Sequence, residues 1–212
     1  MKTNTTPKIV LLLTIFLFIA MTSVAAQVCP AGTTREMYSG TTSSGKVFSF
    51  SNGNWPESLD TTETTIWSLG SYSYNNYVYA GSAYNGKIYQ YDGCEWTMIR
   101  DTNEKDIKSI IEYNGKMFFS SGERGRVFIY DGSTNSWSSW RPSDGDHIYG
   151  YTLEVYNGKL YYGTGWMDGA IYVYDGNSWQ LFDKLDDGER LHVLSLEVFD
   201  GKLYAGPNNG KL

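Results

Sequence analysis

The ionisable residues with the most suggestive spacing stand shortly before a Ser or Thr that recurs along the chain, at Ser68, Ser109, Thr152 and Ser195. Five residues before it stand Glu63, Glu104, His147 and Arg190, and three residues before it stand Thr65, Asp106, Tyr149 and His192. A ring of differing acids, bases and aromatic side chains around a concave mouth is what a small polar ligand needs. The alternative is that these positions are polar only because they lie in solvated loops.

A second group of candidate binding residues lies in segments that differ from one repeat to the next. These segments are Ala83-Tyr84-Asn85, Glu123-Arg124 and Trp166-Met167-Asp168, in which we single out Tyr84, Arg124, Trp166 and Asp168. An exposed indole such as that of Trp166 can stack on a sugar ring while nearby carboxylates bind hydroxyl groups. The competing interpretation is that Trp166 caps a neighbouring repeat.

Catalytic and metal-binding motifs are much weaker. His147 and His192, together with Asp144 and Asp146, could ligate a divalent metal, but the chain has no Cys/His cluster with zinc spacing. It also lacks a Ser/His/Asp order, a P-loop and a dinucleotide fingerprint. We therefore predict no catalytic residues, no metal and no cofactor. An enzyme would need a paired acid and base, for which the available donors are Glu104, Asp106, His147 and His192.

An internal repeat must position these residues. The recurring tryptophans, about 41 residues apart, are Trp55, Trp96, Trp137 and Trp179. Each follows an Asn-Gly or Asp-Gly pair, and a segment similar to Gly-Lys-Ile-Tyr stands upstream, beginning at Gly45, Gly86, Gly125 and Gly169. A third mark, Asn-Gly-Lys-Leu-Tyr or a close variant, begins at Asn114, Asn157 and Asp200. Three marks in constant register indicate repeating structural units.

Each repeat of about 40 residues is predicted to form four short antiparallel strands, here called a, b, c and d in chain order. Examples are strand a at 195–198, strand b at 202–205, strand c at 87–91 and strand d at 96–99. The Asn-Gly and Asp-Gly pairs supply the positive φ angles of tight a–b and c–d hairpin turns. Four strands and a tryptophan per repeat predict an all-β fold built from β-propeller blades. An open β-solenoid is the alternative, although its coils are usually shorter.

The repeats cover residues 35–212, about four and a half blades, after a short tail at 27–34. The first repeat begins at strand b, and the last stops as strand c opens at Gly210. This favours an incomplete ring in this chain, as a truncated reading frame would give. A complete four-bladed ring, or an oligomer formed by pairing with another chain, is the alternative.

Two repeated segments carry a resemblance to known repeat families. They are Tyr-Asn-Gly-Lys-Leu-Tyr at 156–161 and Gly-Lys-Ile-Tyr-Gln-Tyr-Asp-Gly at 86–93, the latter followed by Trp96. Both are similar to kelch-like and galactose-oxidase-like propeller repeats, and the similarity extends over residues 35–212. The kelch double glycine is missing, because Ala80-Gly81, Ser120-Ser121 and Tyr162-Gly163 stand near its place. The resemblance implies the propeller fold and carries over no catalytic residue.

Residues 1–26 have the features of a secretory signal peptide. Lys2 and Lys8 form a positively charged segment before an apolar run at 9–21, and Val24-Ala25-Ala26 supplies small residues before a cleavage site at Gln27. The run is short for a spanning helix, which needs about 20 apolar residues. We therefore expect a secreted or cell-surface protein that does not span the membrane after cleavage. An uncleaved anchor is the alternative.

The cysteines and the net charge bear on the cellular compartment and on the class of binding partner. Cys29 and Cys94 could pair as a disulfide in an oxidising compartment, or remain two thiols. The chain carries 23 Asp and Glu against 17 Lys and Arg, a net charge of −6. Nucleic acid is therefore an unsuitable partner, because its phosphates need a basic face.

Propellers serve many functions, so the fold alone does not choose among them. The variable b–c and d–a loops are predicted at one end of the blades, and the short a–b and c–d turns at the other. We predict a secreted binding module that recognises a glycan or a protein through the variable loops. A carbohydrate-active enzyme (lyase or hydrolase) and a structural cell-surface propeller are the alternatives.

Overall fold

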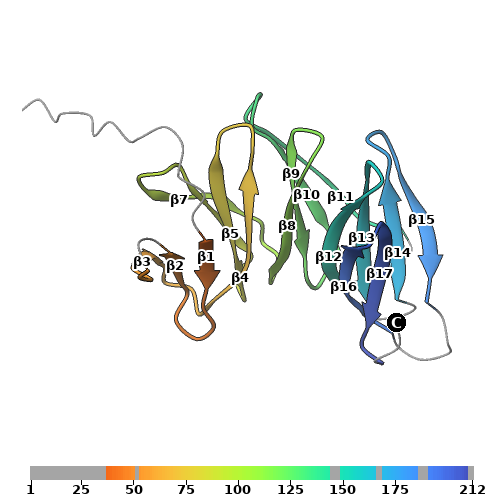
Figure 1. The fold of residues 1–212 in the computed structure, drawn as a ribbon, viewed down its shortest axis with the longest axis horizontal. Helices are drawn as coiled ribbons and strands as arrows, with labels where there is room; N and C mark the ends of the chain where they lie inside the picture. Colours follow the sequence, from red (N-terminus) through yellow and green to blue (C-terminus); the bar gives the residue numbers. More distant parts are fainter. Residues whose placement is uncertain (1–36, 51–52, 144–148, 166–168, 186–190, 210–212) are drawn as a thin grey trace, which may run out of the picture.

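The computed structural model describes residues 37–50, 53–143, 149–165, 169–185 and 191–209. All regular elements in these ranges are β-strands, arranged as five antiparallel sheets. The sheets follow one another in chain order, from the sheet of β1 to the sheet of β17 (Figure 1). We number them blades I to V. The prediction of an all-β fold built from four-stranded blades is confirmed.

Blades II, III and IV have four strands each, whereas three strands are described for blade I and two for blade V. Blade I consists of β1 (Met37–Gly40), β2 (Lys46–Phe50) and β3 (Glu57–Asp60). Blade II consists of β4 (Thr65–Tyr72), β5 (Tyr77–Ala83), β6 (Lys87–Tyr91) and β7 (Trp96–Asp101). Blade III consists of β8 (Ile107–Tyr113), β9 (Lys116–Ser121), β10 (Val127–Asp131) and β11 (Ser136–Trp140). Blade IV consists of β12 (Tyr149–Tyr156), β13 (Lys159–Gly165), β14 (Ala170–Tyr174) and β15 (Trp179–Lys184), and blade V of β16 (Val193–Phe199) and β17 (Lys202–Pro207).

The first strands of blades II to V bring the blades together. β4, β8, β12 and β16 contact one another in that order, and we call them the inner strands. Contacts between the described strands run from each blade to the next, and these ranges do not form a closed ring. Residues equivalent by repeat position on successive inner strands therefore lie on neighbouring blades.

The hairpins that join strands a and b use the left-handed turns that the sequence predicts. Asn114 and Gly115 have φ angles of 48° and 69°, and the Asn157-Gly158 and Asp200-Gly201 pairs also have positive φ. Two successive left-handed residues form the turn whose twist matches that of the flanking strands.

The hairpins that join strands c and d are built differently. Gly93 has a positive φ, but Asp92 does not. Instead, Asp92 Oδ1 accepts hydrogen bonds from the backbone N–H groups of Cys94 and Glu95 at 2.8 and 3.0 Å. Asp175 Oδ1 makes the same pair of contacts in blade IV. The Asp of these turns is therefore needed for its side-chain oxygen, which closes the turn on itself.

Adjacent blades pack closely through a glycine of strand b. A Cβ added to Gly81 would lie 2.5 Å from Ile107 Cγ2 on the inner strand of the next blade. The pattern differs between blades III and IV. Strand b there carries Ser120 in place of the glycine, and the next inner strand carries Gly150 in place of the isoleucine. The space beside Gly150 is occupied by Tyr162, whose hydroxyl would lie 2.1 Å from a Cβ at that position.

A repeated hydrogen bond joins blades II, III and IV each to the blade that follows. The Tyr at the end of strand a donates its hydroxyl to the glycine carbonyl of the following blade's a–b turn. The pairs are Tyr72 with Gly115, Tyr113 with Gly158 at 2.8 Å and Tyr156 with Gly201 at 2.9 Å. These bonds hold the a–b turns of successive blades side by side.

Replacing Tyr113 with Phe should lower the free energy of unfolding by about 1 kcal/mol, because it removes one such bond from a buried position. Urea denaturation of the two proteins measures the difference. Tyr174→Phe is the matched control, since the Tyr174 hydroxyl donates only to Gly176 within its own exposed turn. An equal loss in both variants would show that the bond between blades adds nothing beyond a local contact.

Candidate functional site

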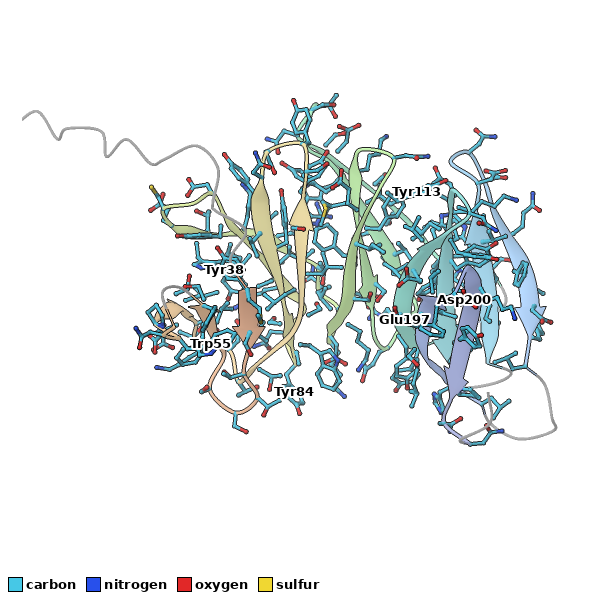
Figure 2. The ribbon with its side chains drawn as sticks, viewed as in Figure 1. Tyr38, Trp55, Tyr84, Tyr113, Glu197 and Asp200 are labelled. Atoms are coloured by element: carbon cyan, nitrogen blue, oxygen red, sulfur yellow. The ribbon has the colours of Figure 1, made fainter. Side chains whose placement is uncertain are left out.

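The segments that vary between repeats lie at one end of the blades. Tyr84, between β5 and β6, is at that end in Figure 2, and Tyr113, at the end of β8, is at the other. The connections from strand d to the next inner strand also reach the first end, because they lead into the start of strand a. We call this the loop end, and the end with the a–b and c–d turns the turn end.

Glu63 and Glu104, which come five residues before the recurring Ser, are buried against strand c of the next blade. Glu63 Oε1 lies 2.7 Å from Lys87 Nζ at the start of β6, and Asn85 Nδ2 donates to Glu63 Oε2 at 2.6 Å. Glu104 Oε1 lies 3.3 Å from Nε of Arg126, directly before β10. Each carboxylate thus fastens the connection between two blades to the following blade.

The two carboxylates have opposite electrostatic environments. Burial acts to raise the pKa of Glu63, but hydrogen bonds and the charge of Lys87 outweigh it and lower that pKa. Burial dominates at Glu104 and raises its pKa, although the positive charges of nearby arginines, led by Arg124, act in the other direction. Oε2 of Glu104 is buried without a hydrogen-bond partner in the described ranges. The charged form is therefore well accommodated at Glu63 and poorly at Glu104.

Asp106 connects two of the predicted candidates. Its Oδ1 accepts a hydrogen bond from the backbone N–H of Tyr84 at 3.1 Å, and its Oδ2 lies 3.6 Å from Lys108 Nζ. Asp106 thereby holds the b–c loop of blade II against the start of blade III. Thr65, at the equivalent place in blade II, is buried at the start of β4, where it pairs with Ala83.

Tyr84 is presented to solvent by an unusual backbone conformation. Its φ is 71°, which is uncommon for an aromatic residue, and its side chain is 60% exposed. The hydrogen bond to Asp106 helps to hold this conformation. Such backbone strain often marks a functional position. Arg124, in the corresponding loop of blade III, is also exposed.

Each inner strand contains a β-bulge, a feature that the sequence analysis missed. The residues left without a pairing partner are Trp67 in β4, Lys108 in β8, Tyr151 in β12 and Leu194 in β16. Each stands one residue before the recurring Ser or Thr, where the side-chain type changes in every repeat. That variation was the available signal. Bulges re-aim a side chain and are common beside functional sites.

Three of these side chains form a row across blades II, III and IV, which we call the bulge row. Lys108 Nζ lies 3.9 Å from the ring centroid of Trp67 and 5.4 Å from that of Tyr151, within the range of cation–π attraction. With Asp106 beside the same ammonium group, the Lys108 side chain is only 10% exposed. Trp67 remains 51% exposed. The row therefore combines an enclosed cation with an accessible indole.

Tyr149 and His192 extend the bulge row towards blade V. The ring centroids of Tyr149 and Tyr151 are 6.3 Å apart, and the His192 ring meets that of Tyr151 edge-on at 5.4 Å. His192 Nδ1 is buried without a hydrogen-bond partner among the described residues, and burial lowers the pKa of His192. The neutral imidazole is therefore favoured at neutral pH. The structure thus brings both of these predicted candidates to the bulge row.

Several predicted positions lie outside the described residues. They are the candidate site residues His147, Trp166, Asp168 and Arg190, the possible metal ligands Asp144 and Asp146, and Cys29. Cys94, in the turn between β6 and β7, is not a free thiol. Its pairing with Cys29 stays a prediction.

The described part of the loop end offers aromatic faces, an enclosed ammonium group and exposed hydroxyl and guanidinium groups. Such a surface suits recognition by packing and hydrogen bonding. Within the described ranges, no three His, Cys, Asp or Glu side chains gather closely enough to hold a metal ion. The same ranges contain no helix with the length and apolar character needed to cross a membrane.

Comparison with known proteins gives matches among solved structures. No family model and no curated protein sequence matches the chain. The WD40 propeller domain of Doa1 matches with a TM-score of 0.64 and 13% identity, over 82% of this chain and 58% of that one. The extracellular domain of BT4673 from B. thetaiotaomicron matches with a TM-score of 0.62 and 15% identity, over 82% and 24%. YCF48 bound to D1 peptide matches with a TM-score of 0.58 and 15% identity, over 82% and 57%.

The chain covers only part of the structures named here. It spans about half the length of U3-55K and of the WD40 repeats of RRP9. It covers 63% of the matching chain of a nidogen/laminin complex, with a TM-score of 0.53 and 14% identity. Identities this low concern the fold alone, so the kelch-like subtype stays a prediction. The chain has the β-propeller fold.

Proposed function

We propose that this chain is an exported binding module that holds an extended segment of a partner protein against the bulge row. The observation that carries the proposal is the placement of Trp67, Lys108 and Tyr151 at the same bulge position of three successive inner strands. A ligand that contacts all three must cross three blades. An extended peptide segment has the length and the alternating side chains to do so.

The chemistry of the row fits a protein partner. Trp and Tyr are the residues that most often dominate binding energy at protein interfaces, and an exposed indole beside an enclosed cation gives such an anchor. Tyr84 and Arg124 lie in the loops that flank the row and would contact the same partner at its rim. Two of the matching propellers were solved with a peptide or within a protein complex, which supports the same use of this fold.

Export is part of the proposal because of the signal-like segment at 1–26. An extracellular domain among the matching structures is compatible with it. A disulfide between Cys29 and Cys94 would suit the same compartment.

The test is selection of a displayed random-peptide library on the purified chain, followed by affinity measurement of the enriched peptides. We expect Trp67→Ala to weaken their binding at least about tenfold, because it removes the accessible indole at one end of the row. Trp55→Ala is the matched control, since Trp55 is another exposed indole but lies in blade I, outside the row. It should leave the affinity unchanged.

Two results would contradict the proposal. One is the absence of peptides that bind the wild-type chain better than the bare support. The other is equal binding of the enriched peptides to the wild type and to Trp67→Ala. Oligosaccharides assayed in parallel separate the predicted glycan ligand from a protein ligand, because only a glycan site would bind sugars in a manner sensitive to Trp67.

A further inference from the structure

A groove lined by aromatic and amide side chains lies at the turn end, between blades II and III. The β4–β5 and β10–β11 turns lie beside each other there (Figure 1). Among its lining residues are Tyr74, Asn75, Gln90, Ile99, Asn135 and Trp137. Its volume of about 580 Å³ is in the range of small-molecule sites in proteins. We call it the amide groove.

The amide groove lies where the junction between blades II and III differs from the next junction. Between blades III and IV the ring of Trp140, which pairs with Val127, stacks on that of Trp179 at 4.5 Å and an angle of 12°. In blade II a bulge shifts the register of β7, so that Arg100 pairs with Ile88 at the equivalent place. Ile99, the residue at this bulge, lines the groove together with Trp137.

The aromatic walls of the groove are partly fixed and partly accessible. The Trp137 ring packs on that of Tyr130 at 4.7 Å, and the guanidinium carbon of Arg100 lies 5.0 Å from its centroid. Trp137 Nε1 has no hydrogen-bond partner among the described residues, whereas the equivalent indole of blade II donates to a serine hydroxyl. The Tyr74 side chain is 60% exposed. Such rings can pack against the C–H face of a sugar, and the indole N–H can donate to a hydroxyl.

The amide side chains of the groove are held in place through their oxygens. Asn75 Oδ1 accepts a hydrogen bond from the backbone N–H of Tyr77, and Asn135 Oδ1 accepts one from the Tyr130 hydroxyl, both at 3.1 Å. The amide nitrogen of Asn135 therefore remains as a donor, and that of Asn75, which donates to the Tyr79 hydroxyl at 3.4 Å, has a second N–H for a ligand. The side chain of Gln90 makes no hydrogen bond to the described residues and offers both a donor and an acceptor. Amides of this kind suit neighbouring hydroxyl groups, which also donate and accept.

Among the described residues, the groove lining contains no Asp, Glu, Lys, Arg or His. An ionic ligand would lose part of its hydration there. No carboxylate of this lining would pair with a cation, and the nearby Arg100 guanidinium already lies over the Trp137 ring. A neutral ligand with many hydroxyl groups has no such cost. Aromatic faces, amide donors and the lack of charge indicate the same class of ligand.

We infer that the amide groove binds a neutral sugar unit, with Trp137 and Tyr74 against its ring and Gln90, Asn75 and Asn135 at its hydroxyls. The groove lies at the opposite end of the blades from the bulge row and shares no residue with it. The inference therefore stands or fails independently of the proposed peptide site.

The test is calorimetric titration of the full exported chain with maltotriose, cellotriose, mannotriose and xylotriose, and with trigalacturonate as an acidic comparison. We expect at least one neutral trisaccharide to bind and trigalacturonate not to bind. Ile99→Trp should reduce the affinity at least tenfold, because it adds the bulk of an indole to the lining of the groove. Gln90→Ala should reduce the affinity in the same direction without adding bulk.

Trp67→Ala, at the loop end, is the control and should bind the trisaccharide as the wild type does. Circular dichroism checks the folding of Ile99→Trp, and Gln90→Ala decides the question alone if that variant does not fold. The inference is overturned if none of the four neutral trisaccharides binds. It is also overturned if binding survives unchanged in the folded groove variants, or if trigalacturonate binds as tightly.

Discussion

Replacing Lys108 with Met should lower the free energy of unfolding by about 3 kcal/mol, because it leaves the buried Asp106 carboxylate without its cation. The side chains of Lys108 and Asp106 are each only 10% exposed, so water does little to replace the lost charge. The substitution also removes the cation from between the rings of Trp67 and Tyr151. Methionine keeps most of the lysine volume, which limits the effect to charge.

Chemical denaturation of a small set of variants measures this loss. Adding Asp106→Asn to Lys108→Met should recover much of it, because the amide oxygen can still accept from the Tyr84 N–H while the buried charge is gone. Lys105→Met is the matched control, since Lys105 pairs with Glu123 at 3.1 Å in an exposed setting. Its loss should be much smaller than that of Lys108→Met, because solvent screens an exposed pair. A similar cost for Lys105→Met and Lys108→Met would show that the ammonium of the bulge row is no better enclosed than a surface charge.

Glu63→Gln and Glu104→Gln should have unequal effects, although the two residues are equivalent by repeat position. At pH 7 we expect Glu63→Gln to cost about 2 kcal/mol, because the carboxylate accepts charge-assisted and neutral hydrogen bonds. Glu104→Gln should cost about 1 kcal/mol or less. Burial makes the charged form of Glu104 unfavourable, and the amide is neutral.

The two variants should also respond to pH with opposite signs. The lowered pKa of Glu63 means that its stabilising contribution is present above the ordinary pKa and is lost as the pH falls through the folded-state value. The cost of Glu63→Gln should therefore shrink on acidification below pH 4.5. The raised pKa of Glu104 means that its contribution is present below the ordinary pKa and is lost as the pH rises through the folded-state value. The cost of Glu104→Gln should therefore not grow from pH 4 to pH 7.

Urea midpoints of the wild type and both variants, measured between pH 3 and pH 7, test the pair. A cost of Glu63→Gln that is constant over this range would exclude the salt bridge with Lys87 as its source. A cost of Glu104→Gln that rises with pH would show that the surrounding arginines outweigh burial at this carboxylate.

The repeat pattern was enough to predict the blades, because turn chemistry and strand alternation depend on neighbours in the chain. Asn114-Gly115 and its equivalents form the expected left-handed turns, and each recurring Trp begins or follows the start of a strand d in blades II to IV. The prediction that the Asp of the c–d turns has a positive φ is wrong, because Asp92 instead accepts hydrogen bonds through its side chain. Both kinds of residue favour turns, and only the structure separates them.

The arrangement at the loop end was less accessible to sequence reasoning. Spacing indicated that Glu63 and Glu104 share a repeat position, but not that strand c of the next blade would receive them. The bulge row was missed because one extra residue interrupts the period-two pattern by which a strand's faces are recognised. The amide groove depends on Ile99 and Trp137, which lie in different repeats and meet only when the blades pack.

Ser120 and Gly150 distinguish the junction between blades III and IV from the other described junctions. Elsewhere a glycine of strand b faces a branched residue, and a larger side chain at Gly81 would collide with Ile107. The Cβ of Ser120 would meet the same collision if blade III packed against an inner strand bearing isoleucine, whereas the inner strand of blade IV carries Gly150 at that position. Similar repeats in one chain risk stacking in the wrong order as they fold. The difference at this junction therefore disfavours packing of blade III against the inner strands of the other described blades.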